Sequence, residues 1–211
     1  MVDHENRNQY TEEQLLKFKE GNKRARIHKN GNIYQSKLFG DYEIIGREAN
    51  SLVIRFLETG HVKKVDKSKA GNGHVKDVFY PSVYGVGYFG VGPYSSKTHP
   101  KIYTKWNDMV KRCYSEKWHV KKPTYISCEV AKEWHNFQVF AKDFEEMCLK
   151  FNIKDLDGIS LDKDIAGDGK IYSKETCILC TVSENSKERN NRSSYKYNPN
   201  NIAELKGGGA E

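Results

Sequence analysis

The hydrophobic pattern of this chain changes its period near residue 100, and that change limits what the chain can fold into. Between residues 31 and 92, glycine, β-branched and aromatic residues dominate. Within this block Leu52, Ile54 and Phe56 occupy alternate positions, as on one face of a strand. From Lys101 onward, apolar residues recur every three or four positions, as on one face of a helix. Because the two periods occupy separate blocks, the sequence predicts an α+β protein with an N-terminal β-rich module.

The first block is predicted to form a small sheet after a short helix that Thr11 caps. The expected elements are a helix over 11–20 and strands over 41–46, 51–57 and 61–65. The basic residues of the block are Arg55, His61, Lys63, Lys64, Lys67, Lys69 and Lys76. On one face of a twisted sheet they would lie in a groove of DNA, with Lys63 and Lys64 as candidate contacts. The alternative is a β scaffold with solubilising lysines.

The second block is predicted to contain helices followed by a strand–loop–strand–helix arrangement. Its expected elements are helices from Lys101 and over 128–149, strands over 159–165 and 171–182, and a last helix over 183–192 with Ser183 as N-cap. The resulting division is a basic N-terminal segment (1–30), a β-rich DNA-binding module (31–96), a ββα domain (97–193) and a flexible tail (194–211).

The charge and cysteine content indicate a polyanionic partner and a reducing compartment. Lys and Arg number 35 against 28 Asp and Glu, which gives a net charge of +7 and favours nucleic acid, with double-stranded DNA as the expected partner. No apolar run approaches the roughly 18 residues of a membrane span. The five cysteines are an odd number and the N-terminus is polar, so we expect a cytoplasmic protein without a small-molecule cofactor.

Asp162 and Asn185 are the candidate metal ligands. Asp162 lies on the first strand of the expected arrangement and Asn185 on its helix, 23 residues later (185 − 162), which allows a hairpin and one helical turn between them. A carboxylate and an amide oxygen suit a hard cation such as Mg²⁺, which retains water that a substrate phosphate can replace. Such a cation would stabilise the charge that develops on a scissile phosphate.

Several motifs in this order resemble phage-borne HNH-like homing endonucleases, which are His-Me finger nucleases. The resemblance covers about residues 75–192. The motifs are Val83–Tyr88, Trp106-x-x-Met109-x-x-Arg112-Cys113-Tyr114, Pro123-Thr124-Tyr125 with Cys128, Glu133-Trp134-x-x-Phe137-x-x-Phe140, Ser160–Ile165, Gly169-Lys170-x-Tyr172-Ser173-x-x-Thr176-Cys177, Glu184-Asn185 and Asn190–Arg192. The resemblance implies an HNH-like ββα-metal domain in which Asp162 and Asn185, or Asn190 in its place, bind the metal. Thr176 stands where the family often has a further Asn.

The sequence departs from the family at the general base. The family usually has a histidine directly after the metal-binding residue, whereas this chain has Lys163. An ordinary lysine is protonated near neutral pH and is not a base, but it can contact the phosphate as a cation, or act as base if burial lowers its pKa strongly. Two further alternatives are that His135 acts as the base, or that the domain binds DNA without cutting it.

The cysteines allow a second kind of metal site. Cys177 and Cys180 form a CxxC pair, and together with Cys113 and Cys128 they would make a structural Zn²⁺ site with four thiolate ligands. The first two are fifteen residues apart (128 − 113), which is not the spacing of a second CxxC pair. That spacing favours the alternative, in which the cysteines are small buried apolar side chains.

Cations between aromatic residues complete the predicted DNA-binding surface. Lys105, Lys111 and Arg112 lie on the first helix of the second block, Trp118 follows in a polar stretch, and Arg192 ends the last helix. The sequence thus favours a DNA-binding, divalent-metal-dependent endonuclease of HNH-like homing type. In it Asp162 and Asn185 hold Mg²⁺ and Lys163 contacts the scissile phosphate. The alternative is a DNA-binding regulator or inhibitor on a degenerate HNH-like fold.

Overall fold

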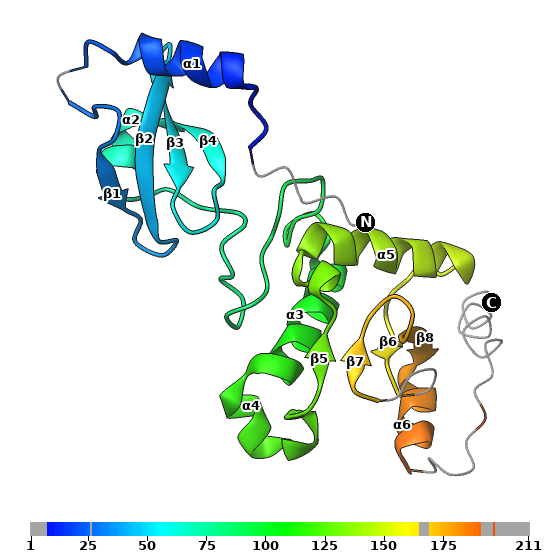
Figure 1. Cartoon of the computed structure of the whole chain (residues 1–211). Helices are drawn as coiled ribbons and strands as arrows, with labels where there is room; N and C mark the ends of the chain where they lie inside the picture. The colour runs from blue at the N-terminus through cyan, green and yellow to red at the C-terminus, as the bar shows by residue number, and fades with distance from the viewer. Residues whose placement is uncertain (1–7, 26, 165–168, 191–195, 197–211) are drawn as a thin grey trace. The chain divides into compact units, whose positions relative to one another are not determined.

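The chain folds as an α+β protein with two compact units, Met1–Tyr80 and Pro81–Glu211 (Figure 1). The computed structural model describes residues 8–25, 27–164, 169–190 and 196. Among them, no helix has both the length and the apolar character that a membrane span needs. The α+β class predicted from the two hydrophobic periods is confirmed.

An antiparallel sheet in the order β1-β2-β3-β4 organises the first unit. Its elements are α1 (Glu12–Gly21), β1 (Ile33–Gln35), β2 (Asp41–Glu48), β3 (Ser51–Phe56), β4 (Val62–Asp66) and α2 (Lys67–Gly71). The three predicted strands and the first helix are present. Thr11 caps α1 through a reciprocal pair of hydrogen bonds with Gln14. The prediction missed β1, which is only three residues long.

Both faces of this sheet are buried. On one face, Phe18 of α1 packs against Val53 and Val62, and Gly46 lets the helix approach, since a Cβ there would lie 2.5 Å from the backbone of Phe18. On the other face, alternate residues of β2 and β3 pack with α2 and the segment that follows it. The buried residues of that face are Tyr42, Ile44, Leu52, Ile54, Phe56, Val65, Ala70 and Val75.

The two candidate DNA contacts of the first unit, Lys63 and Lys64, do not share one face of the sheet. Lys63 and Lys64 are neighbours on β4, so their side chains leave opposite faces of the sheet. The ammonium of Lys63 donates to the carbonyl of Lys76 at 3.1 Å, whereas Lys64 pairs with Glu48 and lies over the ring of Phe18. These two lysines therefore contact opposite sides of the sheet, and the prediction that both contact one DNA groove stays untested.

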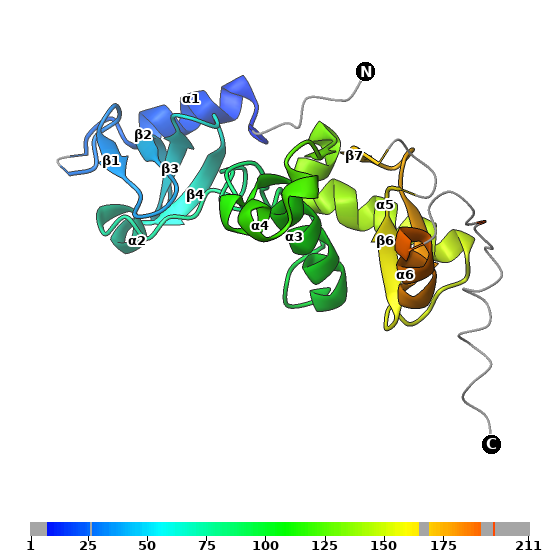
Figure 2. The same ribbon diagram turned by 90° about the horizontal axis from the view of Figure 1, so that it is seen from below.

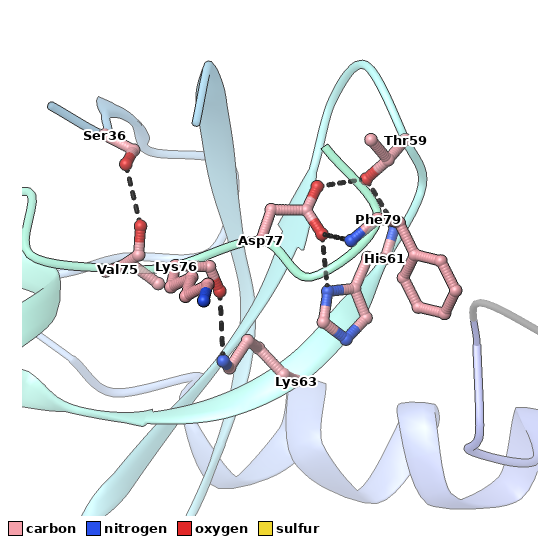
Figure 3. Close-up of polar contacts among 8 residues, drawn as sticks. All are labelled: Ser36, Thr59, His61, Lys63, Val75, Lys76, Asp77 and Phe79. Atoms are coloured by element: carbon pink, nitrogen blue, oxygen red, sulfur yellow. Dashed lines mark hydrogen bonds and ion pairs between the residues drawn. The ribbon is translucent and has the colours of Figure 1, made fainter. Parts of the chain in front are cut away.

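A buried polar cluster fastens the end of the first unit to the sheet (Figure 3). The carboxylate of Asp77 is buried and accepts hydrogen bonds from His61 Nδ1 at 2.8 Å, from the hydroxyl of Thr59 and from the backbone N–H of Phe79. Burial alone would raise the pKa of Asp77, but the hydrogen bonds outweigh it and lower that pKa. Asp77 therefore stabilises the unit in its charged form.

Two long helices, with aromatic residues packed between them, organise the second unit. Its elements are α3 (Pro100–Tyr114), α4 (Glu116–Lys121), η1 (Pro123–Tyr125), β5 (Glu129–Val130), η2 (Lys132–His135), α5 (Phe137–Lys150), β6 (Ile159–Asp162), β7 (Ile171–Tyr172), β8 (Ile178–Thr181) and α6 (Val182–Asn190). Trp106 of α3 and Phe137 of α5 are fully buried with ring centroids 5.3 Å apart, and the indole N–H of Trp106 donates to the carbonyl of Trp134.

Two element boundaries differ from the prediction. The helix expected over 128–149 begins only at Phe137, because the side chain of Asn136 caps it by accepting from the N–H of Gln138. The residues before it form β5, which pairs in parallel with β7, and the 3₁₀ helix η2. The strand expected over 171–182 is two strands, since β7 pairs with β5 and β8 pairs with β6.

The units separate after Tyr80, whereas the sequence predicts a boundary after residue 96. Hydrogen bonds attach the intervening segment to α5 and η2, because Tyr88 pairs with His135 and Phe137, and Gln138 binds the carbonyls of Phe89 and Tyr94. Gly90 and Gly92 allow this approach, since a Cβ on either would collide with the side chains of Asn136 and Gln138. The glycines that suggest a β module thus serve the second unit.

Replacing Asp77 with alanine should destabilise the first unit by about 2–4 kcal/mol, because it leaves the buried His61 and Thr59 without their acceptor. Hydrogen exchange of the β2–β4 amides, followed by mass spectrometry, measures the loss within that unit. The exposed Asp41→Ala variant is the control and should exchange like the parent chain.

The same cluster fixes the sign of the pH dependence. Since the pKa of Asp77 is lower in the folded state than its ordinary 3.8, its contribution is complete above about pH 4 and is lost as the pH falls through the folded value. The protection of β2–β4 should fall with acid in the parent chain more steeply than in Asp77→Ala. Equal acid sensitivity of the two chains would contradict this role.

Candidate functional site

The antiparallel strands β6 and β8 and the helix α6 form a strand–strand–helix unit near the C-terminal end of the described residues (Figures 1 and 2). The strands are antiparallel, with Asp162 opposite Ile178, and α6 packs against both. Thr181 and Glu184 form a reciprocal cap, since each side chain accepts from the other residue's N–H at 3.0 Å. The N-cap of the last helix is thus Thr181, and the prediction of Ser183 is wrong.

Alternation along β6 gives its two faces different roles. Ile159 and Leu161 belong to the aromatic core, so Ser160 and Asp162 leave the opposite face. Asn185 lies over that face, where its amide nitrogen donates to the hydroxyl of Ser160 at 2.8 Å. Asp162 is 5% exposed, and its carboxylate accepts from the N–H of Asp164. The two predicted metal ligands therefore share one face of the strand–strand–helix unit.

The donor set on this face fits a hard cation that keeps much of its water. Among the described residues, no group of three or more His, Cys, Asp and Glu side chains is arranged to hold a metal. The face supplies the carboxylate of Asp162, the amide oxygen of Asn185 and the hydroxyl of Ser160, which are all oxygen donors. Mg²⁺ is commonly held by one or two carboxylates, water and the substrate phosphate, so these residues fit it better than they fit Zn²⁺.

A small polar pocket lies between α3 and β6. It has a volume of about 80 Å³, and its lining includes Thr104, Lys105, Asp108, Arg112, Ser160 and Tyr172. Lys105 and Arg112 are seven residues apart and so point from the same side of α3. Met109 and Leu161 of the aromatic core also line the pocket, and Ser160 is the lining residue that in addition contacts Asn185.

The two cations of the pocket are held in place by polar partners. The ammonium of Lys105 donates to the carbonyl of Ile159, and the guanidinium of Arg112 bonds to the hydroxyl of Tyr172. Burial lowers the pKa of Lys105, and the nearby charge of Arg112 lowers it further. The carboxylate of Asp108, which also lines the pocket, acts in the opposite direction on the pKa of Lys105 and offsets part of this repulsion.

Lys163 points away from this face. Its side chain is 6% exposed, and its ammonium binds Asp164 at 2.6 Å and the carbonyl of Gly169, with the rings of Tyr125 and Tyr172 beside it. Burial works to lower the pKa of Lys163, but the pairing with Asp164 prevails and raises it. A buried ammonium with a raised pKa does not accept a proton, and in this arrangement it does not reach a phosphate at Asp162.

His135 belongs to a different part of the unit. Its Nε2 lies 3.1 Å from the carbonyl of Val130 and 3.3 Å from the hydroxyl of Tyr114, both on the β5 side of the core. Burial lowers the pKa of His135, so the ring is neutral at pH 7 and its Nε2 donates to the carbonyl. These contacts give His135 a positioning role on β5 and do not bring it to Asp162 or Asn185.

The four cysteines of the predicted zinc site divide between the two faces of β8. Cys113, Cys128 and Cys177 lie in the aromatic core, whereas Cys180 faces the other way and its thiol points to the carbonyl of Ser160. Burial raises the pKa of Cys113 and of Cys177 to about 12, so both are protonated thiols at neutral pH. Small buried apolar side chains describe these residues better than thiolate ligands do.

The remaining predicted contacts are distributed over other surfaces. Lys111 points from a different side of α3 than Lys105 does, and its ammonium lies 4.9 Å from the ring centroid of Trp118. The side chain of Asn190 and all of Arg192 lie outside the part of the chain that the structure describes. The sequence prediction missed Ser160 and Tyr172 as pocket residues. For Ser160 the signal was its spacing from Asp162, since residues two apart on a strand lie on one face.

Comparisons of this chain with models of protein families, with curated proteins and with solved structures found no match. The resemblance to HNH-like endonucleases therefore stays a prediction based on the sequence motifs.

Removing the ammonium of Lys163 tests whether its buried contacts stabilise the second unit. Lys163→Met should lower the free energy of unfolding by roughly 2–4 kcal/mol, because Asp164 and the carbonyl of Gly169 lose their buried partner. Urea unfolding followed by tryptophan fluorescence reports on the second unit, since all three tryptophans lie in it. Lys187→Met, at an exposed position of α6, is the control. A urea midpoint of Lys163→Met equal to that of the parent chain would contradict a stabilising role for Lys163.

Proposed function

We propose that this chain is a DNA-binding phosphodiester hydrolase that uses a divalent metal, an endonuclease with an HNH-like site. The observation that carries the proposal is the β6–β8–α6 unit, in which Asn185 bonds to Ser160, two residues before Asp162 on β6, and Ser160 also lines the pocket of Lys105 and Arg112. Oxygen ligands next to two cations are what a scissile phosphate and its metal require. The net charge of +7 agrees with a polyanionic substrate.

The residues of the site would divide the work by their chemistry. Asp162 and Asn185 would hold Mg²⁺, which stabilises the charge that develops on the phosphate when it is bound. Lys105 and Arg112 would fix an adjacent phosphate in the pocket, with Arg112 oriented by Tyr172. Lys163, which was expected at the phosphate, would instead hold the loop after β6 against β7 through Asp164 and Gly169.

A second candidate function is DNA binding without cleavage, as a regulator or inhibitor of another nucleic-acid enzyme. The observation that favours it is the position of the two predicted bases. Lys163 is paired and has a raised pKa, and His135 donates to a carbonyl on β5. In that case the same face would bind the DNA backbone, and the proton of an attacking water would have no acceptor among these two residues.

The Asp162→Ala variant separates the two functions. For the nuclease we expect cutting of a supercoiled plasmid with Mg²⁺ to fall at least a hundredfold, since the single carboxylate ligand is lost, while DNA affinity changes little. Glu175→Ala, an exposed acid of the same unit, should cut like the parent chain. Plasmid cutting that Asp162→Ala leaves unchanged refutes the site, and binding without cutting by the parent chain favours the regulator.

The cationic pocket predicts a change in salt dependence. Lys105→Ala and Arg112→Ala should each weaken binding to duplex DNA of any sequence and reduce the slope of log affinity against log salt by about one, since each removes one phosphate contact. Fluorescence anisotropy with a labelled duplex between 50 and 200 mM salt measures this. Lys154→Ala, an exposed lysine outside the pocket, should keep the parent slope; unchanged slopes in both pocket variants would remove the pocket from the interface.

A further inference from the structure

A second hollow of the second unit lies between the turn at Tyr84 and helix α4. Its volume of about 560 Å³ is in the range that holds a nucleotide-sized ligand. The lining includes the aromatic rings of Tyr84 and Trp118 and the three lysines Lys111, Lys117 and Lys121. None of these five residues belongs to the proposed nuclease site, so the hollow is a separate candidate site.

The backbone of Tyr84 is strained. Its φ is +51°, a left-handed conformation that bulky side chains seldom adopt, and its side chain is still 39% exposed. Paired hydrogen bonds between Val83 and Gly87, at 2.8 and 2.9 Å, close the turn around it, and Gly87 lies against the ring of Trp106. Asparagine or glycine would suit this backbone better, so the ring is not explained by the fold of the turn.

Trp118 is the partly exposed one of the three tryptophans, since Trp106 and Trp134 are at most 1% exposed. Helix α4 holds its indole at the wall of the hollow, and Ser115 caps that helix. Lys111 lies over the ring, at 4.9 Å from its centroid. The indole N–H is covered and has no hydrogen-bond partner in the described part of the chain, so the indole presents its ring and not its N–H to the hollow.

The charge of the hollow is positive. Lys117 and Lys121 are exposed, and the ion pairs formed among the described residues include none of the three lysines. Two rings that can stack, with cations around them, match a nucleotide, whose base has an apolar face and whose phosphate is an anion. An apolar peptide would match the rings and the exposed Val120 of the lining, but not the lysines.

We infer that this hollow binds one unpaired DNA nucleotide, with its base against Tyr84 and Trp118 and its phosphates on the lysines. The nucleotide is unpaired because a base inside a duplex stacks on its neighbours and exposes no face to a side chain. The inference rests on the proposed DNA-binding function and deepens it. The chain would engage the duplex through Lys105 and Arg112 and hold a single-stranded or extruded nucleotide at α4.

The test uses the full chain carrying Asp162→Ala, without metal, and a labelled single-stranded oligo(dT). Trp118→Ala should weaken its binding about tenfold or more, and Trp118→Phe should keep most of the affinity, because each stacked ring contributes on that scale. Titration should quench tryptophan fluorescence in the parent chain and not in Trp118→Phe, since the other two tryptophans are buried. Lys117→Ala and Lys121→Ala should each reduce the salt slope by about 0.7, and Lys154→Ala should not.

Tyr84 gives a control for folding. Tyr84→Gly relieves the left-handed strain, so we expect a higher Tm together with weaker oligo(dT) binding, whereas Tyr84→Phe should bind like the parent chain. A purely structural role for the ring predicts instead a lower Tm and unchanged affinity. The inference would be overturned if Trp118→Ala and Tyr84→Gly bind oligo(dT) as tightly as the parent chain does. It would also be overturned if the parent chain binds the matching oligoribonucleotide more tightly than oligo(dT).

The inference and the proposed function fail separately. A parent chain that never cuts a plasmid, yet binds oligo(dT) through Trp118, refutes the nuclease and keeps the nucleotide site. A chain that cuts with Mg²⁺, and whose single-strand affinity is untouched by these variants, keeps the nuclease and refutes the nucleotide site. Plasmid cutting is measured with Asp162 intact and binding with Asp162→Ala, so neither result depends on the other.

Discussion

The alternation of side chains along β6 is the constraint on which the candidate site depends. Ile159 and Leu161 are buried in the aromatic core of the second unit, at 2% and 6% exposure, which fixes the register of the strand. A shift by one residue would place Ser160 and Asp162 in that core, where a carboxylate without a partner is very costly. Core packing thus determines that the polar residues of the strand face α6 and Asn185.

The sequence predicted the parts of the fold that short-range patterns determine. The periodicity of Trp106, Met109 and Val110 predicts α3, and the alternation around Ile54 predicts β3; both elements are present. The start of α5 was not predictable from periodicity, because residues 129–135 keep helical spacing although β7 pairs with β5. Periodicity also did not predict that both faces of the first sheet are buried, because Phe18, which covers one face, comes from a helix far away in the sequence.

The same distinction applies to the site. The separation of Asp162 and Asn185 leaves room for a strand pair and one helical turn, but the sequence does not show that the chain between β6 and β8 contains β7, which pairs with β5. The role of Lys163 depends on Gly169 and Asp164 and on two rings, and the only sign in the sequence was its place after Asp162, from which alternation sends it to the other face. Where a long side chain finds its partner depends on tertiary structure.

Helix α3 connects the two regions that we assign to DNA. Lys105 and Arg112 point from one side toward β6, whereas Lys111 precedes Arg112 by a single residue and is therefore rotated about 100° away, toward Trp118. Because one rigid helix carries all three cations, the distance between the pocket and the hollow is set by its backbone and not by loops. Phosphates bound at both places would then have to match a spacing that this helix fixes.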